Sequence, residues 1–205
     1  MIYDFADKAI RDMNKRNLRL FHRLSVLEFD EVNVFGEVRK VYDSSARLAK
    51  KRYEAIYIDA YLAAMEGMER ESDGPDDDLV NDWLLDMLED YDAVTHYRFN
   101  EETERKKERT AEALIATHDG KRTDAREVDK VLKQWTLQVS QYADRSADDG
   151  TIQAYRDAGV EYVQWHTEED EKVCKYCQEL DGKIFPITDV PKKQHYRCRC
   201  WLSKA

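Results

Sequence analysis

Residues 34–68 read VFGEVRKVYDSSARLAKKRYEAIYIDAYLAAMEGM, and this stretch indicates the fold class of the whole chain. Apolar residues recur in it at steps of three and four positions, which places them on one face of an α-helix and the charged residues on the other. The residues of the apolar stripe are Val38, Val41, Tyr42, Leu48, Tyr53, Ile56, Tyr57, Ala60 and Tyr61. The stretch predicts one long helix with this Tyr-rich stripe in the core, the alternative being a stripe that binds a partner.

The helical pattern continues on both sides of this stretch. Helix is predicted through the first 70 residues, and again from about Leu79 to Tyr91 after the break at Gly74 and Pro75. A charged run at 101–109 is expected to be a solvated helix face, because charges of both signs alternate in it. Helix resumes through residues 128–142, is expected to break at SADDGT (146–151), and then continues briefly to a stop at Gly159.

The period of the sequence changes after Gly159. VEYVQWHT (160–167) is rich in β-branched and aromatic residues and predicts a strand. Asp181 and Gly182 lie between apolar flanks, which indicates a tight turn. The predicted fold is therefore mainly α: a long-helix N-terminal body at 1–150 with a small C-terminal α+β zinc-binding lobe at 151–205.

Composition and charge limit the possible functions. The 205 residues are 42% hydrophobic and 37% charged with a net charge of −10, which favours solvated helices and argues against nucleic-acid binding by the whole surface. From residue 171 onward eight Lys or Arg face four Asp or Glu, so this end is +4 and the first 170 residues are −14. This makes the C-terminal end the predicted basic surface, although the same charges equally suit a lobe that is merely kept soluble. The basic residues in question are Lys192, Lys193, Arg197 and Arg199.

The chain shows no signal for export or membrane insertion. The N-terminus is charged from residue 4, and no apolar run approaches the roughly 18 residues of a membrane span. A reducing cytoplasm is therefore expected, which makes a disulfide framework a weaker interpretation of the cysteines.

All four cysteines lie in the last 32 residues, in KVCKYCQELDGKIF (172–185) and HYRCRC (195–200). In Cys174-x-x-Cys177 a two-residue knuckle can turn both sulfurs to one side, and Cys198 and Cys200 share one face of an extended segment. Four such ligands suit a closed, structural zinc site that stabilises a lobe too small for its own core. The predicted ligands are the four cysteines, with His195 as a fifth candidate and the most plausible substitute for Cys198.

Disulfides, free thiols or a redox pair are the alternatives at the cysteines. A thioredoxin-like site needs its Cys-x-x-Cys in a βαβ unit, which this helical pattern does not offer. The acidic turn at 168–171 is expected to be solvated rather than catalytic. No Gly-rich phosphate loop, GxSxG or HExxH occurs, so the chain is not expected to be an enzyme.

These residues also carry a resemblance. AYRDAGVEYVQWHTEEDEKVCKYCQELDGKIFPI (154–187) and HYRCRC together resemble the C-terminal part of the minor head proteins of tailed bacteriophages, the Mu F-type head morphogenesis family. VTHYRFNEETERKKERTAEAL (94–114) is more loosely similar to the helical body of that family. The matching elements are Gly159, Trp165, Asp170, Cys174 with Cys177, Leu180-Asp181-Gly182, and His195 with Cys198-Arg199-Cys200.

The resemblance implies a minor virion protein that sits inside the head, bound to the portal oligomer at the DNA-entry vertex. Assistance in assembly or in DNA packaging or delivery is implied as well, with packaged DNA as a partner of the basic lobe and no membrane contact. Two other interpretations stay open. One is a zinc lobe that binds DNA as a regulator, and the other is an enzyme, either a thiol oxidoreductase or a hydrolase that uses the acidic turn.

Overall fold

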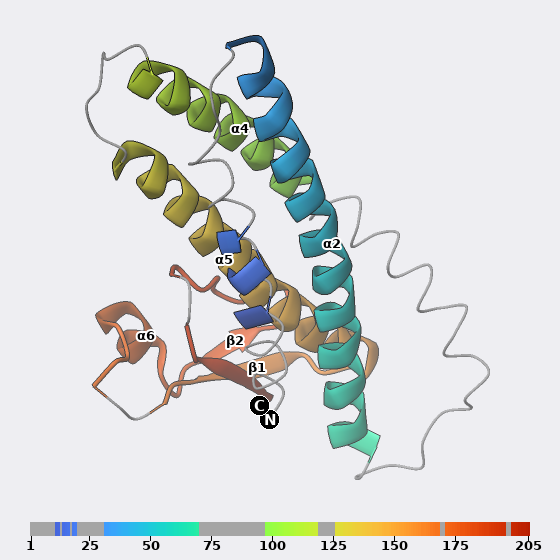
Figure 1. The fold of residues 1–205 in the computed structure, drawn as a ribbon. Coiled ribbons are helices and arrows are strands. Elements are labelled where there is room, and N and C mark those ends of the chain that lie inside the picture. The colour runs from blue at the N-terminus through green and yellow to red at the C-terminus, as the bar shows by residue number, and fades with distance from the viewer. Residues whose placement is uncertain are drawn as a thin grey trace, which may run out of the picture.

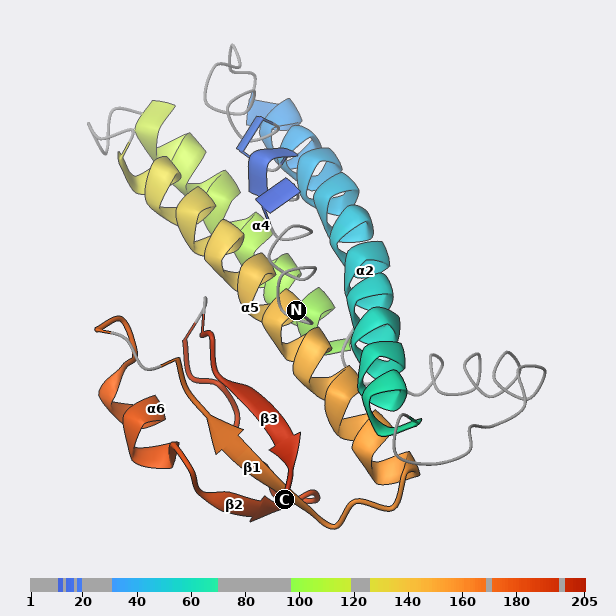
Figure 2. The same cartoon turned by 90° about the horizontal axis from the view of Figure 1, so that it is seen from below.

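The computed structural model describes residues 11, 12, 14–16, 18, 19, 31–69, 97–118, 126–168, 171–195 and 198–205. Three long helices dominate it: α2 (Glu31–Glu69), α4 (Tyr97–His118) and α5 (Arg126–Asp157). They lie side by side as a bundle, with a small sheet and the short helix α6 (Lys175–Leu180) beside the C-terminal half of α5 (Figures 1 and 2). The predicted class, mainly α with a small C-terminal lobe, is confirmed. The helix predicted at 79–91 falls outside the described residues.

The Tyr-rich stripe of α2 is core, as its spacing predicted. Tyr42 and Tyr53 are fully buried and meet aromatic rings of the other two helices. The Tyr42 and Trp135 ring centroids are 5.0 Å apart, and Phe99 lies 5.5 Å from Trp135 and 5.3 Å from Tyr53. The hydroxyls of these two tyrosines are hydrogen-bonded: Tyr42 pairs with Thr110 Oγ1 at 2.7 Å, and Tyr53 donates to the Val139 carbonyl at 2.9 Å. The aromatic rings therefore bring all three helices into one core.

Helix α5 runs without interruption through residues 146–151, so the predicted break there is wrong. Gly150, which suggested the break, lies against α2: a Cβ added to it would stand 2.3 Å from the Tyr57 carbonyl oxygen. Ser146 and Thr151 donate their hydroxyls to carbonyls four residues back, which keeps these polar side chains satisfied inside the helix. The glycine thus permits close helix packing instead of ending the helix. The predicted domain division at residue 150 falls inside α5.

Gly150 provides a direct test of this packing. Gly150→Ala should lower the free energy of unfolding by about 1–3 kcal/mol, because the new methyl group would force α2 and α5 apart. Gly67→Ala is the matched control, since nothing lies within 4 Å of a Cβ at that position of α2. Chemical unfolding should show the control unchanged or stabilised by up to about 1 kcal/mol. Equal effects at the two positions would contradict the close approach.

The C-terminal lobe begins where α5 ends. Gly159 has φ +73°, the left-handed conformation expected at that stop, and the Val160 N–H bonds back to the Tyr155 carbonyl at 2.9 Å. The predicted strand follows as β1 (Tyr162–His166). It is the central strand of an antiparallel sheet in the order β2-β1-β3, with β2 (Ile184–Pro186) and β3 (Trp201–Lys204) at its edges.

Candidate metal centre

The first cysteine pair belongs to the start of helix α6. Cys174 caps this helix, and its Sγ accepts a hydrogen bond from the Cys177 backbone N–H at 3.4 Å. This bond turns the two-residue knuckle so that the Cys174 sulfur faces the first turn of the helix. Cys177 is buried on that turn. The predicted geometry for Cys-x-x-Cys is therefore present.

The turn at Asp181 and Gly182 connects α6 to the sheet. Gly182 has φ +71°, and its N–H donates to the Trp165 carbonyl at 2.8 Å. The Asp181 carboxylate accepts the Thr167 backbone N–H at 2.8 Å. These bonds fix α6, and with it the first cysteine pair, against the end of β1.

The second pair and the histidine come from the segment before β3. Cys198 and Cys200 are buried and His195 is half-buried. His195 Nε2 lies 3.1 Å from Cys174 Sγ and 3.8 Å from Cys177 Sγ, and the Cys177 and Cys198 sulfurs are 3.6 Å apart. All five residues predicted as ligands are thus brought together in one cluster.

The five side chains form two groups that share one residue. Cys174, Cys177 and His195 make up the first group, and Cys177, Cys198 and Cys200 the second; within each group the ligand atoms lie within 4.8 Å of one another. Among the described residues, these two are the groups of three or more His, Cys, Asp or Glu side chains that could hold a metal ion. Cys177 is the one member common to both, so each complete group contains it.

The proton affinities of the thiols differ strongly. The pKa of Cys174 is lowered: burial opposes this, but the Cys177 N–H and His195 outweigh it. Burial, with the contact to Cys174, raises the pKa of Cys177 to about 12. A hydrogen bond with Cys200 lowers the pKa of Cys198 to about 5, and the same bond together with burial raises that of Cys200. A divalent cation bound here would lower the pKa of all the coordinating thiols, including those that are raised without it, because the cation favours the thiolate at every ligand.

A hydrophobic layer surrounds the cysteines. Trp165 and Leu180 belong to the same hydrophobic cluster as the four cysteines, together with Leu202 of β3. Trp165 is 2% exposed, and its indole N–H has no hydrogen-bond partner. This cluster is separate from the aromatic core of the bundle.

Three polar contacts attach this lobe to α5. Lys193 Nζ lies 2.8 Å from an Asp148 carboxylate oxygen, and the two side chains are only 3% and 15% exposed. Tyr155 donates its hydroxyl to the Leu202 carbonyl at 3.4 Å, and Arg156 donates to the Ile187 carbonyl at 3.2 Å. The sequence predicted Lys193 as part of an exposed basic surface. The structure shows that its side chain is buried instead.

Lys192 and Arg199, of the same predicted basic surface, are exposed. The fourth basic residue, Arg197, lies outside the described residues. The acidic turn is partly described: Glu168 and Glu171 are exposed, as expected of a solvated turn.

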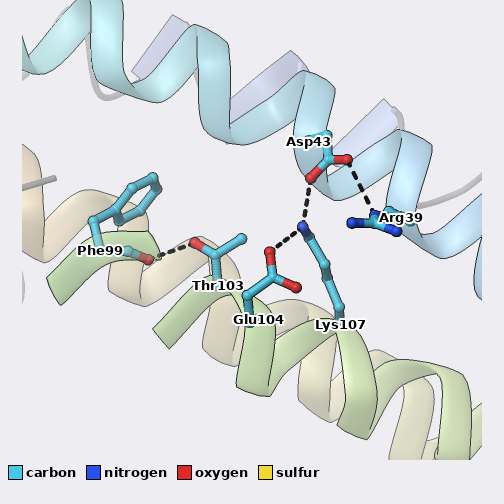
Figure 3. A network of polar contacts seen from close by, with 6 residues as sticks. All are labelled: Arg39, Asp43, Phe99, Thr103, Glu104 and Lys107. Atoms are coloured by element: carbon cyan, nitrogen blue, oxygen red, sulfur yellow. Dashed lines mark hydrogen bonds and ion pairs between the residues drawn. The ribbon is translucent and has the colours of Figure 1, made fainter. Parts of the chain in front are cut away.

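The charged run at 101–109 contains a second cluster that the sequence did not indicate (Figure 3). Lys107 of α4, expected on a solvated face, has a side chain only 10% exposed and contacts both Asp43 and Glu104. The buried cation is thus neutralised by two carboxylates, one from α2 and one from its own helix. A cavity of about 300 Å³ adjoins this cluster, with Arg47 and Lys50 on its α2 side.

None of the described helices combines the length and apolar character needed to cross a membrane.

Comparison with known protein families gives one match. A family model described as phage Mu protein F like protein matches residues 102–203, from α4 through β3. The matched region includes all five candidate ligands and the α5 residues that hold the lobe. No curated protein and no solved structure matches the chain.

Proposed function

The chain belongs to the phage Mu protein F-like family, a family of phage head morphogenesis proteins, and on this premise we propose that it is a minor head protein of a tailed phage. The single observation that carries this proposal is the family match from α4 through the cysteine cluster. The protein sits inside the head and is bound to the portal oligomer at the DNA-entry vertex. It takes part in assembly or in the packaging or delivery of DNA.

The role of the two parts follows from their surfaces. The bundle has a closed aromatic core, and most of the exposed residues of α2, α4 and α5 are charged. Charge complementarity would therefore direct its docking on another protein. The C-terminal lobe faces packaged DNA with its exposed basic residues, Lys192 and Arg199 among them. The protein has a structural role, as the family has, rather than a catalytic one.

The cysteine cluster holds one structural zinc ion. A tetrahedral site with Zn–S bonds of about 2.3 Å and Zn–N bonds of about 2.1 Å places sulfurs about 3.8 Å apart and sulfur and nitrogen about 3.6 Å apart. The Cys177–Cys198 separation of 3.6 Å and the Cys177–His195 separation of 3.8 Å are close to those values. With Cys174, these residues form the preferred ligand set. Cys198 belongs to the second group rather than the first, so its sulfur would move toward Cys174 and His195 when the ion binds. Cys200 is the alternative fourth ligand through its bond to Cys198.

Two substitutions distinguish these ligand sets. His195→Ala should reduce the zinc content of the purified protein well below one equivalent, whereas Cys200→Ser should keep most of it. The reason is that His195 contacts both Cys174 and Cys177. Cys200 belongs to the other group, with Cys177 and Cys198. Metal analysis with cobalt substitution measures both content and ligand type, since thiolate and imidazole ligands give different cobalt spectra. The opposite order, with zinc lost only in Cys200→Ser, would establish the four-cysteine site.

The function itself is tested in phage-producing cells. Mature heads are purified and their proteins are quantified by mass spectrometry, and the tagged chain is used to isolate its partners. The chain should be present in heads and should copurify with the portal oligomer. Copurification of DNA or host regulators without any head protein would instead favour a zinc-lobe regulator.

A further inference from the structure

The cavity beside Lys107 lies between α2 and α4 and has polar walls. Its volume is about 300 Å³. Buried Ala46, Thr103 and Lys107 line its inner part, whereas Arg47 and Asn100 line it with exposed side chains. We call this hollow the α2–α4 cavity; its other lining residues are Asp43, Lys50 and Glu104. It therefore leads from the surface of the bundle to a buried cation.

Both carboxylates of the α2–α4 cavity are already paired with that buried cation. Figure 3 shows the Lys107 ammonium between Asp43 and Glu104, and its Nζ lies 2.5 Å from Glu104 Oε1. Asp43 has a further cation beside it, since its Oδ2 lies 3.9 Å from Arg39 Nε. Each carboxylate that lines the cavity thus has a cation of the protein as its partner.

Three hydrogen-bond donors of the α2–α4 cavity, by contrast, are unpaired. Within the ranges that the structure describes, the side chains of Arg47, Lys50 and Asn100 form no hydrogen bond and no ion pair. A guanidinium has five N–H donors, an ammonium three and an amide two. The cavity therefore has a surplus of donors, and a ligand that suits it must supply acceptors.

The charge of the α2–α4 cavity indicates which acceptor fits best. Its three cations and two carboxylates leave a net charge of +1. One carboxylate would bring this charge to zero, whereas a phosphate dianion would make it negative again. A carboxylate also matches the planar fork of N–H donors that a guanidinium presents. The walls are therefore best complemented by a single carboxylate.

Size and long-range charge argue against a nucleic-acid ligand at the same place. A volume of about 300 Å³ lies at the lower limit for small-ligand pockets. The first 170 residues carry a net charge of −14, and a field of that sign repels a polyanion much more strongly than a single acidic group. The cavity is thus suited to one acidic group and not to a DNA backbone.

We propose that the α2–α4 cavity binds one carboxylate group through Arg47 and Lys50, with the Asn100 amide as an additional donor. The group belongs to an acidic side chain of another protein or to a small free carboxylic acid, because both present the same atoms to these donors. Glu104 weakens the binding by charge repulsion. The site is separate from the cysteine cluster, and the inference goes beyond the proposed function without depending on it.

The test is an NMR titration of the purified full chain with N-acetylglutamic acid α-amide, which carries one carboxylate. Sodium chloride keeps the ionic strength constant, and the side-chain amide signals of Asn100 report binding. Arg47→Gln removes the main donor, and Arg105→Gln is the matched control, because Arg105 is exposed on α4 but does not line the cavity. Backbone amide spectra and thermal unfolding verify that each variant keeps its fold.

The expected result is a saturable shift of the Asn100 signals in the wild type and in Arg105→Gln. The dissociation constant should rise about tenfold in Arg47→Gln, equivalent to a loss of about 1.4 kcal/mol. It should fall in Glu104→Gln, because this change removes a repelling charge while Asp43 still pairs with Lys107. A merely structural role of these residues would not give opposite effects at Arg47 and Glu104.

Two outcomes would overturn the inference. One is a shift that does not saturate or that is equal in Arg47→Gln and Arg105→Gln, which would indicate nonspecific screening. The other is inorganic phosphate binding more tightly than the probe. Succinate separates the two sources: weaker binding than the probe supports an acidic side chain, and tighter binding supports a small free acid. No phage particle enters these measurements, so a failure here leaves the proposed function untouched.

Discussion

Cys177→Ser is expected to abolish zinc binding and to unfold the C-terminal lobe while the three-helix bundle stays folded. Cys177 is the only cysteine that belongs to both ligand groups, so no remaining set of three contains a complete group. Zinc supplies on the order of 10 kcal/mol to small sites of this kind, which is more than the lobe gains from its short sheet. The aromatic core of the bundle is a separate cluster and loses no contact.

The measurement combines metal analysis, far-UV circular dichroism and limited proteolysis. The variant should hold less than a tenth of an equivalent of zinc, keep nearly all of its helical signal and be cleaved after α5. Glu179→Ser is the matched control, since Glu179 is exposed on the same short helix. A chelator should produce the same cleavage pattern in the wild type. Full zinc content in Cys177→Ser, or a folded lobe without zinc, would refute the structural metal site.

Much of the fold was visible in the sequence because it depends on periodicity. The steps of three and four residues in α2 follow from helix geometry, and the β-branched and aromatic run at 160–167 has the composition of a half-buried strand. Gly159 adopts the left-handed conformation that predicted the helix stop. The geometry of Cys174-x-x-Cys177 was predicted for a similar reason, since the spacing of two residues within one turn is a local property.

The features that the sequence did not reveal depend on contacts between distant segments. Gly150 reads as a helix breaker unless Tyr57 is known to lie against it. The sequence around Lys107 predicts a solvated side chain, because charges of both signs alternate along that helix. In the structure Asp43, which is 64 residues away in the sequence, contacts Lys107 and neutralises its charge. The same holds for Lys193, whose partner Asp148 is 45 residues away. In each case the deciding neighbour is supplied by packing, which local patterns do not contain.

Separating Lys193 from Asp148 is expected to give the second large effect, and the two single variants should differ. Asp148→Ala removes the carboxylate that lies 2.8 Å from the Lys193 ammonium, whose side chain is 3% exposed, so it should cost about 3–5 kcal/mol of folding free energy. Lys193→Met should cost less, because the Asp148 side chain is 15% exposed and water can reach the remaining carboxylate. The double variant Lys193→Met/Asp148→Leu should recover most of the loss, since it replaces the ion pair by apolar groups.

Chemical unfolding of the wild type, Lys193→Met, Asp148→Leu and the double variant gives the coupling energy between the two residues, because each single variant then carries a substitution that is present in the double. Lys192→Met, a change at the exposed neighbour, is the control and should lie within about 0.5 kcal/mol of the wild type. If both single variants match this control, the ion pair does not hold the lobe to α5. If Asp148→Ala releases the lobe to proteolysis while its zinc content is unchanged, the pair sets the position of the lobe on the bundle and the metal sets its fold. That result would separate two properties of the lobe: an internal structure that depends on the ion, and an orientation to which the buried Lys193–Asp148 pair contributes alongside the contacts of Tyr155 and Arg156.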